Sequence, residues 1–201
     1  ESEKGGTDRP IWAIDRGVNI CHTLSLPPAH LIGDRDSAAH DAWAWAEEHG
    51  ARVHAFPPAK DFTDTELALR IAAELMPSAL VILTGAFGGR FDHLMSVASV
   101  AAHAALPCIL ADEREALFFL HGDESLTITC DSPPQAISLL PFTEECTGIT
   151  TNGLRWELSH AQIHTHSSTT ISNVLAESNT EHRFSVTLGS GILGVYLCHK
   201  E

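Results

Sequence analysis

The chain has 201 residues, of which 44% are hydrophobic, and its 12 Lys and Arg against 26 Asp and Glu give a formal net charge of −14. Nucleic acids and anionic membranes attract clustered basic residues, so neither is an expected partner of this chain. In addition, no apolar run approaches the ~20 residues of a membrane-spanning helix.

The first part of the chain alternates between strand and helix patterns. Apolar runs at residues 10–15, 51–56, 79–85 and 107–112 predict buried strands, and helical patterns lie between them at 36–50, 63–75 and 92–105. Asp36 or Ser37 is the expected N-cap of the first helix, and Gly50 its terminator. Thr63, three residues before Glu66, begins the second helix with the spacing of a capping box. We therefore expect an α/β domain over residues 1–121, with a mostly parallel sheet flanked by helices.

From about residue 122 the helical pattern is replaced by short strand-like runs. These runs are "SLTITC", "QAISLLPF", "GITTNGLRWEL", "AQIHTHS" and "FSVTLGSGILGVYLCH", separated by Gly, Pro, Asn and Asp. Regularly spaced short strands of this kind are typical of antiparallel sheets packed face to face. The sequence thus predicts an all-β antiparallel sandwich domain over residues 122–201.

Two acidic loops follow strand-like segments of the α/β part. In "GDRDS", Asp34 and Asp36 lie two residues apart, so either they share a hard cation such as Mg²⁺ or Asp36 caps the next helix. In "KDFTDTE", helix capping leaves Asp61 without a structural task. Because loops after parallel strands meet at the carboxyl edge of a sheet, we expect both at a ligand site there.

A third loop, "TGAFGGRFDH", combines a glycine-rich turn with charged residues. Gly85, Gly88 and Gly89 lie between a strand and a helix, an order that directs backbone N–H groups and a helix N-terminus at an anion. The spacing fits neither a P-loop nor the dinucleotide fingerprint. Arg90 could bind a phosphate through two hydrogen bonds, and Asp92 could cap the helix or orient a substrate hydroxyl.

Histidine and cysteine are candidates for other chemistry. His164 and His166 would share one face of a strand, but a zinc site needs further ligands that the sequence does not supply at a familiar spacing. We therefore interpret the 13 histidines as surface or core side chains. The five scattered cysteines lack a CxxC pair and predict reduced, buried thiols in a cytoplasmic protein.

The three loops, in this order and at these intervals, resemble the motif series of the thiamine pyrophosphokinase family. "SLLPF", "GITTNGLRWEL", "SN" (172–173) and "GSGILGVY" continue the resemblance, which runs from about Asp15 to Tyr196. It implies Mg²⁺-dependent transfer of pyrophosphate from ATP to the hydroxyl of thiamine, yielding thiamine diphosphate and AMP. It also implies a homodimer, with thiamine between the α/β domain of one subunit and the sandwich of the other.

The resemblance assigns roles to individual residues of this chain. It implies that Asp34, Asp36 and Asp61 bind Mg²⁺, and that the catalytic residues are Arg90, Asp92 and Asp64. Nucleotide binding falls to Asp15, Lys60, Thr63, Gly85, Gly88, Gly89 and Arg90. Ser172 and Asn173 would face the thiamine ring, with Asp92 at its hydroxyl. Trp156 would be either a wall for the cationic ring or a core tryptophan of the sandwich.

Two alternatives to this function stay open. One is a pyrophosphokinase of the same fold that acts on another acceptor alcohol, and the other is a non-catalytic module that binds thiamine. The chain also departs from the family pattern after its first strand, where Arg16 stands at a position that the family usually fills with a small residue.

Overall fold

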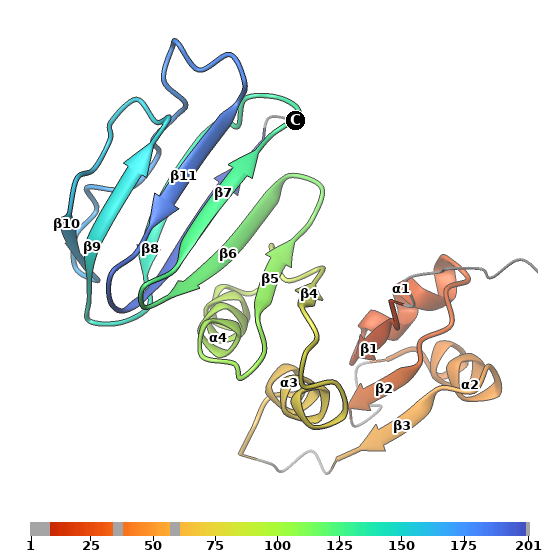
Figure 1. Ribbon diagram of the computed structural model, residues 1–201. Coiled ribbons are helices and arrows are strands. Elements are labelled where there is room, and N and C mark those ends of the chain that lie inside the picture. The colour runs from red at the N-terminus through yellow and green to blue at the C-terminus, as the bar shows by residue number, and fades with distance from the viewer. Residues whose placement is uncertain (1–8, 34–37, 57–60, 200–201) are drawn as a thin grey trace, which may run out of the picture. The chain divides into compact units, whose positions relative to one another are not determined.

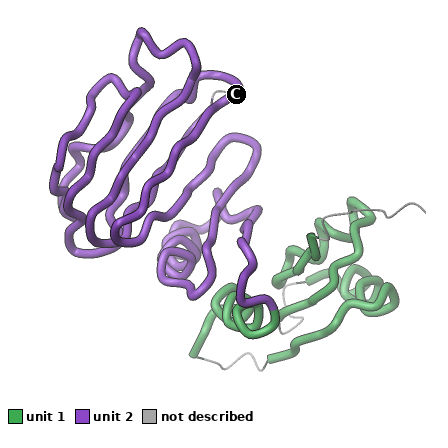
Figure 2. The backbone as a smooth tube through the Cα atoms, in the orientation of Figure 1, with its two compact units in different colours: residues 1–75 green, residues 76–201 purple. Residues whose placement is uncertain are grey.

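The computed structural model describes residues 9–33, 38–56 and 61–199 (Figure 1). The chain divides into two compact units, residues 1–75 and 76–201 (Figure 2). None of the helices in the described ranges combines the length and apolar character that a membrane span requires. The boundary expected between residues 121 and 122 separates the predicted α/β domain from the predicted sandwich domain, and it stays a prediction.

The first unit is a three-stranded parallel sheet with helices. Its strand order is β1-β2-β3, and the strands are β1 (Trp12–Ile14), β2 (His30–Gly33) and β3 (Arg52–Ala55). Its helices are α1 (Gly17–Thr23), α2 (His40–Glu48) and α3 (Asp64–Leu75). These elements confirm the predicted strand–helix alternation and the parallel pairing, although β2 was not among the predicted strands.

Helices cover both faces of this small sheet. Ala13 of β1 and Leu31 of β2 pack into a core with buried side chains of α1 and α2, among them Val18 and Trp43. Because side chains alternate along a strand, Ile32 faces the side opposite Leu31, and it is fully buried. Helix α3 contacts β1 and β2 and covers the side of the sheet away from α1 and α2 (Figure 1). The unit therefore has the layered α/β arrangement that the sequence predicted.

Two of the expected capping features are present at the helix ends. Gly50 adopts a φ of +89°, and the Ala51 N–H donates to the Ala46 carbonyl, which is the hydrogen bond of a Schellman motif. The Glu66 N–H donates to Thr63 Oγ1 at 3.2 Å, as the capping spacing predicted. The expectation that Asp36 or Ser37 caps the first predicted helix is wrong, because α2 begins at His40 and its N-cap is Ala39. Asp36 and Ser37 themselves lie outside the described residues.

Helix α1 was not predicted from the sequence. It has only seven residues, and its "GVNICHT" sequence contains Gly, Asn and Thr, which are poor helix formers. An isolated helix of this length is not stable in water. Burial of Val18 and Cys21 in the core of the unit supplies the missing stability.

The second unit contains α4 (Phe91–Ala102) and two sheets. The five-stranded sheet has the order β4-β5-β6-β12-β8 and consists of β4 (Val81–Leu83), β5 (Cys108–Ala111), β6 (Glu115–His121), β12 (Ile192–Cys198) and β8 (Ala136–Pro141). The four-stranded sheet has the order β10-β9-β11-β7 and consists of β10 (Ala161–His164), β9 (Glu145–Asn152), β11 (Arg183–Thr187) and β7 (Ser125–Thr129).

The two sheets of this unit form the predicted sandwich (Figure 1). Their shared core is continuous and apolar, with Leu193 and Val195 contributed by β12 and Phe184 and Val186 by β11. Strands β4 and β5 pair in parallel, but they belong to the same sheet as the antiparallel strands of the sandwich. The parallel strands predicted for the α/β part are thus distributed over two sheets, and β6, which was not predicted, joins β5 to the sandwich.

All five cysteines carry free thiols. Cys21, Cys108 and Cys146 are buried, whereas Cys130 and Cys198 are half-buried. Burial raises the pKa of the Cys108 thiol to about 11, so this thiol is protonated and unreactive at neutral pH.

A pair of histidines lies beside a tryptophan on the sheet of the first unit. His30 Nδ1 and His54 Nε2 are 2.8 Å apart, and the Trp12 ring stacks on His30 with centroids 4.0 Å apart. Burial lowers the pKa of both imidazoles below the ordinary value of 6.5, with a further lowering from Arg52. The folded chain therefore favours the neutral form of this pair.

We predict that acid destabilises the first unit through these histidines. Between the lowered pKa of the folded state and the ordinary value near 6.5, the unfolded chain binds more protons. The contribution of the pair to stability is thus complete above pH ~6.5 and is lost as the pH falls toward the folded-state pKa. In His54→Gln, the thermal midpoint should fall less between pH 7.5 and 5.5 than in the wild type. His103→Gln, at the exposed residue that follows α4, is the control, and equal slopes in all three proteins would contradict the assignment.

Candidate functional site

In the first unit, the carboxylate of Asp15 lies directly against Gly33. Asp15 follows β1 with a φ of +48°, and its N–H donates to the Ile32 carbonyl at 2.9 Å. Gly33 ends β2 with a φ of +149°, and a Cβ on it would lie 2.8 Å from Asp15 Oδ1. A side chain at position 33 would therefore displace the Asp15 carboxylate and would also have to adopt a φ that residues other than glycine rarely take. Arg16, the departure from the family pattern, is exposed at the start of α1.

The second acidic loop leads into α3. Asp61 is exposed, Asp64 is half-buried in the first turn of the helix, and Thr63 caps it. The Thr63 hydroxyl accepts from the Glu66 N–H and keeps its own O–H to donate. The other predicted residues of these loops, Asp34, Asp36 and Lys60, lie outside the described residues.

The glycine turn connects β4 to α4 in the second unit. Gly85, Gly88 and Gly89 have φ values of +71°, +85° and +71°, a region that other residues rarely adopt. A Cβ at any of the three would meet nothing within 4 Å, so glycine is required by the backbone rather than by a close neighbour. The turn therefore presents bare backbone at the N-terminus of a twelve-residue helix, as predicted for an anion site.

Arg90 and Asp92 form a two-pronged ion pair at the end of this turn. Arg90 Nε donates to Asp92 Oδ1 at 3.1 Å, and a terminal nitrogen donates to Oδ2 at 2.6 Å. Asp92 Oδ1 also accepts from the His93 N–H at 3.0 Å. Both side chains are exposed, by 73% and 62%, so solvent and ligands can reach the pair. The hydrogen bond from Arg90 lowers the pKa of Asp92, and the carboxyl is ionised at neutral pH.

Asn173 holds the backbone of Trp156. Its Oδ1 accepts from the N–H groups of Trp156 and Val174, and its Nδ2 donates to the Trp156 carbonyl at 2.8 Å. Both oxygen lone pairs and one of the two N–H groups are used in this way, which leaves one N–H for a ligand. Asn173 is also tied to β8 by backbone hydrogen bonds with Ile137.

Trp156 itself is a surface side chain. It is 59% exposed, so the expectation of a core tryptophan is wrong. The Arg155 guanidinium lies over its ring, 5.2 Å from the centroid. Trp156 and Asn173 also line one small, largely apolar cavity of about 90 Å³ at the edge of the sandwich core. The structure thus brings together two of the three residues predicted to face thiamine.

The third of these residues, Ser172, is adjacent in the chain and held in an unusual conformation. Its φ is +62°, which is uncommon for a residue with a side chain. Its N–H donates to the hydroxyl of Ser138, a buried residue of β8, at 3.0 Å. Ser138 was not predicted from the sequence, because a lone serine in a strand gives no periodic signal.

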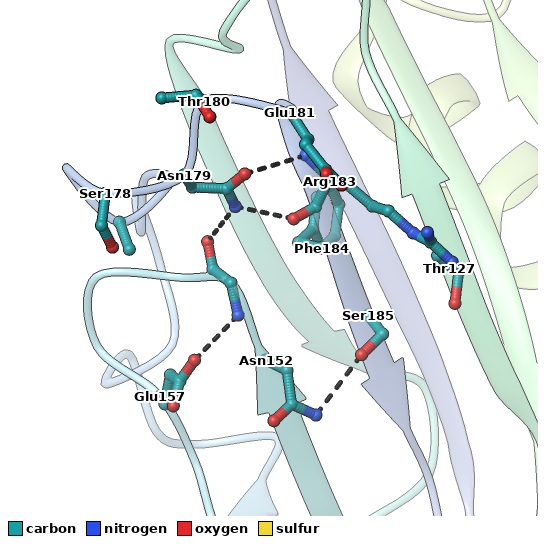
Figure 3. A pocket seen from close by; sticks show the side chains of 12 residues that line it. Thr127, Asn152, Glu157, Ser178, Asn179, Thr180, Glu181, Arg183, Phe184 and Ser185 are labelled. Carbon is teal, nitrogen blue, oxygen red and sulfur yellow. Dashed lines mark hydrogen bonds between the residues drawn. The ribbon is translucent and has the colours of Figure 1, made fainter.

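A larger polar cleft of about 520 Å³ lies beside β9 and β11. Figure 3 shows the side chains that line it. Here Asn179 Nδ2 donates to the carbonyls of Gly153 and Arg183, while the Gly153 N–H donates to Glu157. A Cβ on Gly153 would lie 2.5 Å from the Arg183 carbonyl, which fixes glycine at this position. These hydrogen bonds connect the loop that carries Trp156 to β11. We therefore interpret the polar residues that line the cleft as the support of that loop.

The described residues do not contain a ready-made cluster for a metal ion. Within the three described ranges, no three His, Cys, Asp or Glu side chains are grouped to hold an ion. His164 and His166 stack with centroids 5.2 Å apart, half-buried and exposed, respectively. Of the three residues predicted to hold Mg²⁺, only Asp61 is described, and its carboxylate offers the oxygen donors that Mg²⁺ prefers.

Two family descriptions match the chain in succession. "Thiamin pyrophosphokinase, catalytic domain" matches residues 7–109, and "Thiamin pyrophosphokinase, vitamin B1 binding domain" matches residues 125–193. The chain belongs to the thiamin pyrophosphokinase family. The first match contains Asp15, Gly33 and the glycine turn, and the second contains Trp156 and Asn173.

Individual members of the family are similar over nearly the whole chain. A thiamine pyrophosphokinase from Bacillus subtilis is 28% identical over 186 residues, which cover 90% of this chain and 86% of that protein. The crystal structure of thiamine pyrophosphokinase from Bacillus subtilis superposes with a TM-score of 0.81 at 25% identity, covering 98% of this chain and 91% of that one. The structure from Geobacillus thermodenitrificans gives 0.79 at 25% identity, with coverages of 98% and 89%.

We predict that Gly33→Ala disrupts the acidic end of the first unit. The new Cβ would overlap the Asp15 carboxylate, and an alanine at position 33 would be strained at a φ of +149°. The free energy of unfolding should therefore fall by about 1–3 kcal/mol. Gly17→Ala is the matched control, because a Cβ there meets nothing within 4 Å. It should leave stability unchanged or raise it by up to about 1 kcal/mol. Urea unfolding measures both values, and equal stabilities of the two variants would contradict the contact.

Proposed function

We propose that the chain transfers the pyrophosphoryl group of ATP to the hydroxyl of thiamine, giving thiamine diphosphate and AMP in a Mg²⁺-dependent reaction. Its membership of the thiamin pyrophosphokinase family supports an enzyme of the thiamine diphosphokinase type. The observation that carries the proposal is the Arg90–Asp92 pair, which follows the glycine turn at the start of α4. A cation for phosphate and a carboxylate for the acceptor stand there side by side.

Arg90 and the glycine turn are the proposed phosphate site. Attack on the β-phosphorus of ATP places negative charge on phosphate oxygens, which an arginine and backbone N–H groups stabilise. Gly85, Gly88 and Gly89 have no side chains to block the approach of a phosphate to the backbone. Exposure of the Arg90 guanidinium leaves it able to exchange Asp92 for a phosphate oxygen.

Asp92 is the proposed contact of the thiamine hydroxyl. Because Arg90 lowers the pKa of this carboxyl, Asp92 is a weak base and a good hydrogen-bond acceptor. This favours orientation of the hydroxyl as its main task, with proton acceptance following once phosphate has taken Arg90. The reacting oxygen would then lie beside the phosphates that the turn holds.

Asp34, Asp36 and Asp61 are the proposed holders of Mg²⁺, with Asp64 as a further catalytic participant. When bound, Mg²⁺ would neutralise phosphate charge during the transfer. The exposed Asp61 carboxylate supports the assignment, because its donor atoms are oxygens. Asp15, Lys60 and Thr63 complete the proposed nucleotide contacts, and the exposed position of Thr63 supports its share.

Trp156, Asn173 and Ser172 are the proposed thiamine site. Arg155 already lies over the Trp156 ring, which supports this ring as a partner for a second cation, the thiazolium of thiamine. Asn173 keeps one N–H free while it fixes Trp156. The strained backbone of Ser172 supports a functional position, since such conformations persist at ligand sites.

The proposal extends to assembly, domain roles and compartment. We propose a homodimer, which the exposed apolar side chains of Phe91 and Met95 on α4 support. We place the boundary between ATP-binding and thiamine-binding parts at residues 121/122, within the gap between the two family matches. Five free thiols support a reducing, cytoplasmic compartment.

Product analysis tests the function. The protein is incubated with ATP, Mg²⁺ and thiamine, and nucleotides and thiamine esters are separated by chromatography. We expect AMP and thiamine diphosphate in equal amounts. Arg90→Lys keeps the charge but cannot form the two-pronged contact, so its rate should fall about 100-fold. ADP with thiamine monophosphate, or AMP formed only with another alcohol, would contradict the proposed reaction.

A second variant tests the thiamine site separately. Asn173→Ala removes two hydrogen bonds to the Trp156 backbone and one from the Val174 N–H, so thiamine affinity should fall about tenfold or more, while ATP affinity stays unchanged. Asn152→Ala, which loses a single 3.4 Å bond to Ser185, is the control. Calorimetric titration with each substrate measures the change. An equal loss of both affinities would contradict the assignment, and thiamine binding without any ATP binding would favour a non-catalytic module.

A further inference from the structure

The glycine turn has one aromatic side chain, Phe87, which packs back against the sheet. Along residues 84–90, only Ala86 and Phe87 are half-buried, and the rest are exposed. The three glycines make no packing contact that a Cβ would sense. The Phe87 ring lies against Tyr196 of β12, with ring centroids 6.4 Å apart and planes tilted by 58°. Such a geometry is within the range of favourable aromatic pairs.

Tyr196 is itself held on the sheet. Its hydroxyl donates to the carboxylate of Glu115, the first residue of β6. Glu115 is in turn fixed by a tight turn, because its N–H and that of Arg114 both donate to Asp112 Oδ1, at 2.8 and 2.9 Å. A continuous set of contacts thus runs from the turn through Tyr196 to the β5–β6 hairpin.

We propose that Tyr196 is a positioning residue that holds the glycine turn, through Phe87, in the geometry that binds the phosphates of ATP. The inference rests on the proposed function and deepens it. A turn made of glycine has many accessible backbone conformations, and fixing it in advance lowers the entropic cost of binding the nucleotide. Tyr196 does not touch the reacting atoms. It acts on the turn, and therefore on ATP, without any contact with thiamine.

The same face of the sheet provides a matched control. Phe119 of β6 packs edge-to-face on Phe142, with centroids 5.2 Å apart. This pair resembles Phe87–Tyr196 in chemistry, but it joins two segments of the sandwich and not the turn. Phe119→Leu therefore shows how the loss of an aromatic contact affects the stability of the fold alone. Phe87→Leu has the same kind of effect and also removes the contact that ties the glycine turn to Tyr196. Tyr196→Phe removes only the hydroxyl that bonds to Glu115.

Because Tyr196 is the only tyrosine in the chain, its signal can be observed directly. The protein is labelled with ¹³C-tyrosine, and the single ring signal is recorded with Mg²⁺ and an ATP analogue whose α–β bridge is a methylene group. We expect the analogue to move the signal in the wild type and in Phe119→Leu, but not in Phe87→Leu. In kinetics, Phe87→Leu and Tyr196→Phe should raise KM for ATP about two- to tenfold and leave KM for thiamine unchanged.

Failure of this inference and failure of the proposed function are distinguishable. If the wild type forms AMP and thiamine diphosphate but Phe87→Leu behaves like Phe119→Leu, the positioning role is wrong and the function stands. An unmoved Tyr196 signal in a wild type that binds the analogue would likewise overturn the positioning role alone. A wild type that forms no AMP overturns the proposed function, and the positioning role with it.

Discussion

The register of strand β12 is the constraint on which the second unit depends. This strand lies between β6 and β8, and its alternate side chains point in opposite directions. Leu193, Val195 and Leu197 fill the sandwich core, whereas Gly194 and Tyr196 lie on the outer face. A slip of one residue would move Tyr196 into the core and expose the leucines. Packing of the sandwich core therefore also fixes the position of Tyr196, the residue on which the Phe87 ring packs.

That outer face connects two segments far apart in the sequence. Tyr196 is opposite Ser138 in the β12–β8 register, and the Ser138 hydroxyl accepts from the Ser172 N–H. The glycine turn rests on the same face through Phe87. Neighbouring positions on a single sheet thus support the proposed phosphate turn and one of the proposed thiamine residues. Glycine at position 194 serves the same face, because a Cβ there would lie 2.7 Å from the Phe142 ring.

Much of this architecture could be predicted because it depends on local patterns. Apolar periodicity located most strands and three helices, and capping rules located Thr63 and Gly50 correctly. Helix α1 escaped because its stability comes from burial of Val18 and Cys21, a tertiary effect that short windows cannot sense. Sheet membership escaped for the same reason, since a run such as 107–112 reads alike in a parallel and a mixed sheet.

The features of the candidate site likewise differ in whether they depend on local sequence or on tertiary structure. Glycines and charged residues of the turn were visible in the sequence because their chemistry and spacing are local. The close approach of Asp15 to Gly33 was not, because it joins the ends of two strands. Likewise, the bonds from Asn173 to Trp156 span 17 positions, and only the fold shows that an expected ligand contact is also the support of an aromatic side chain.

The strongly acidic character of the chain gives the Arg90–Asp92 ion pair a role in how the proposed reaction attracts and activates its substrates. A net charge of −14 disfavours the approach of an anionic nucleotide, so in the proposed reaction the attraction would come from Mg²⁺ and local donors. In the structure, Asp92 already holds Arg90 at the mouth of the turn. In the proposed reaction, a phosphate that takes Arg90 leaves Asp92 without its cation, and the pKa of the carboxyl rises toward its ordinary value. The carboxylate then becomes the better acceptor for a hydroxyl proton only after the nucleotide has bound. A single exposed ion pair would in this way couple nucleotide binding to activation of the acceptor.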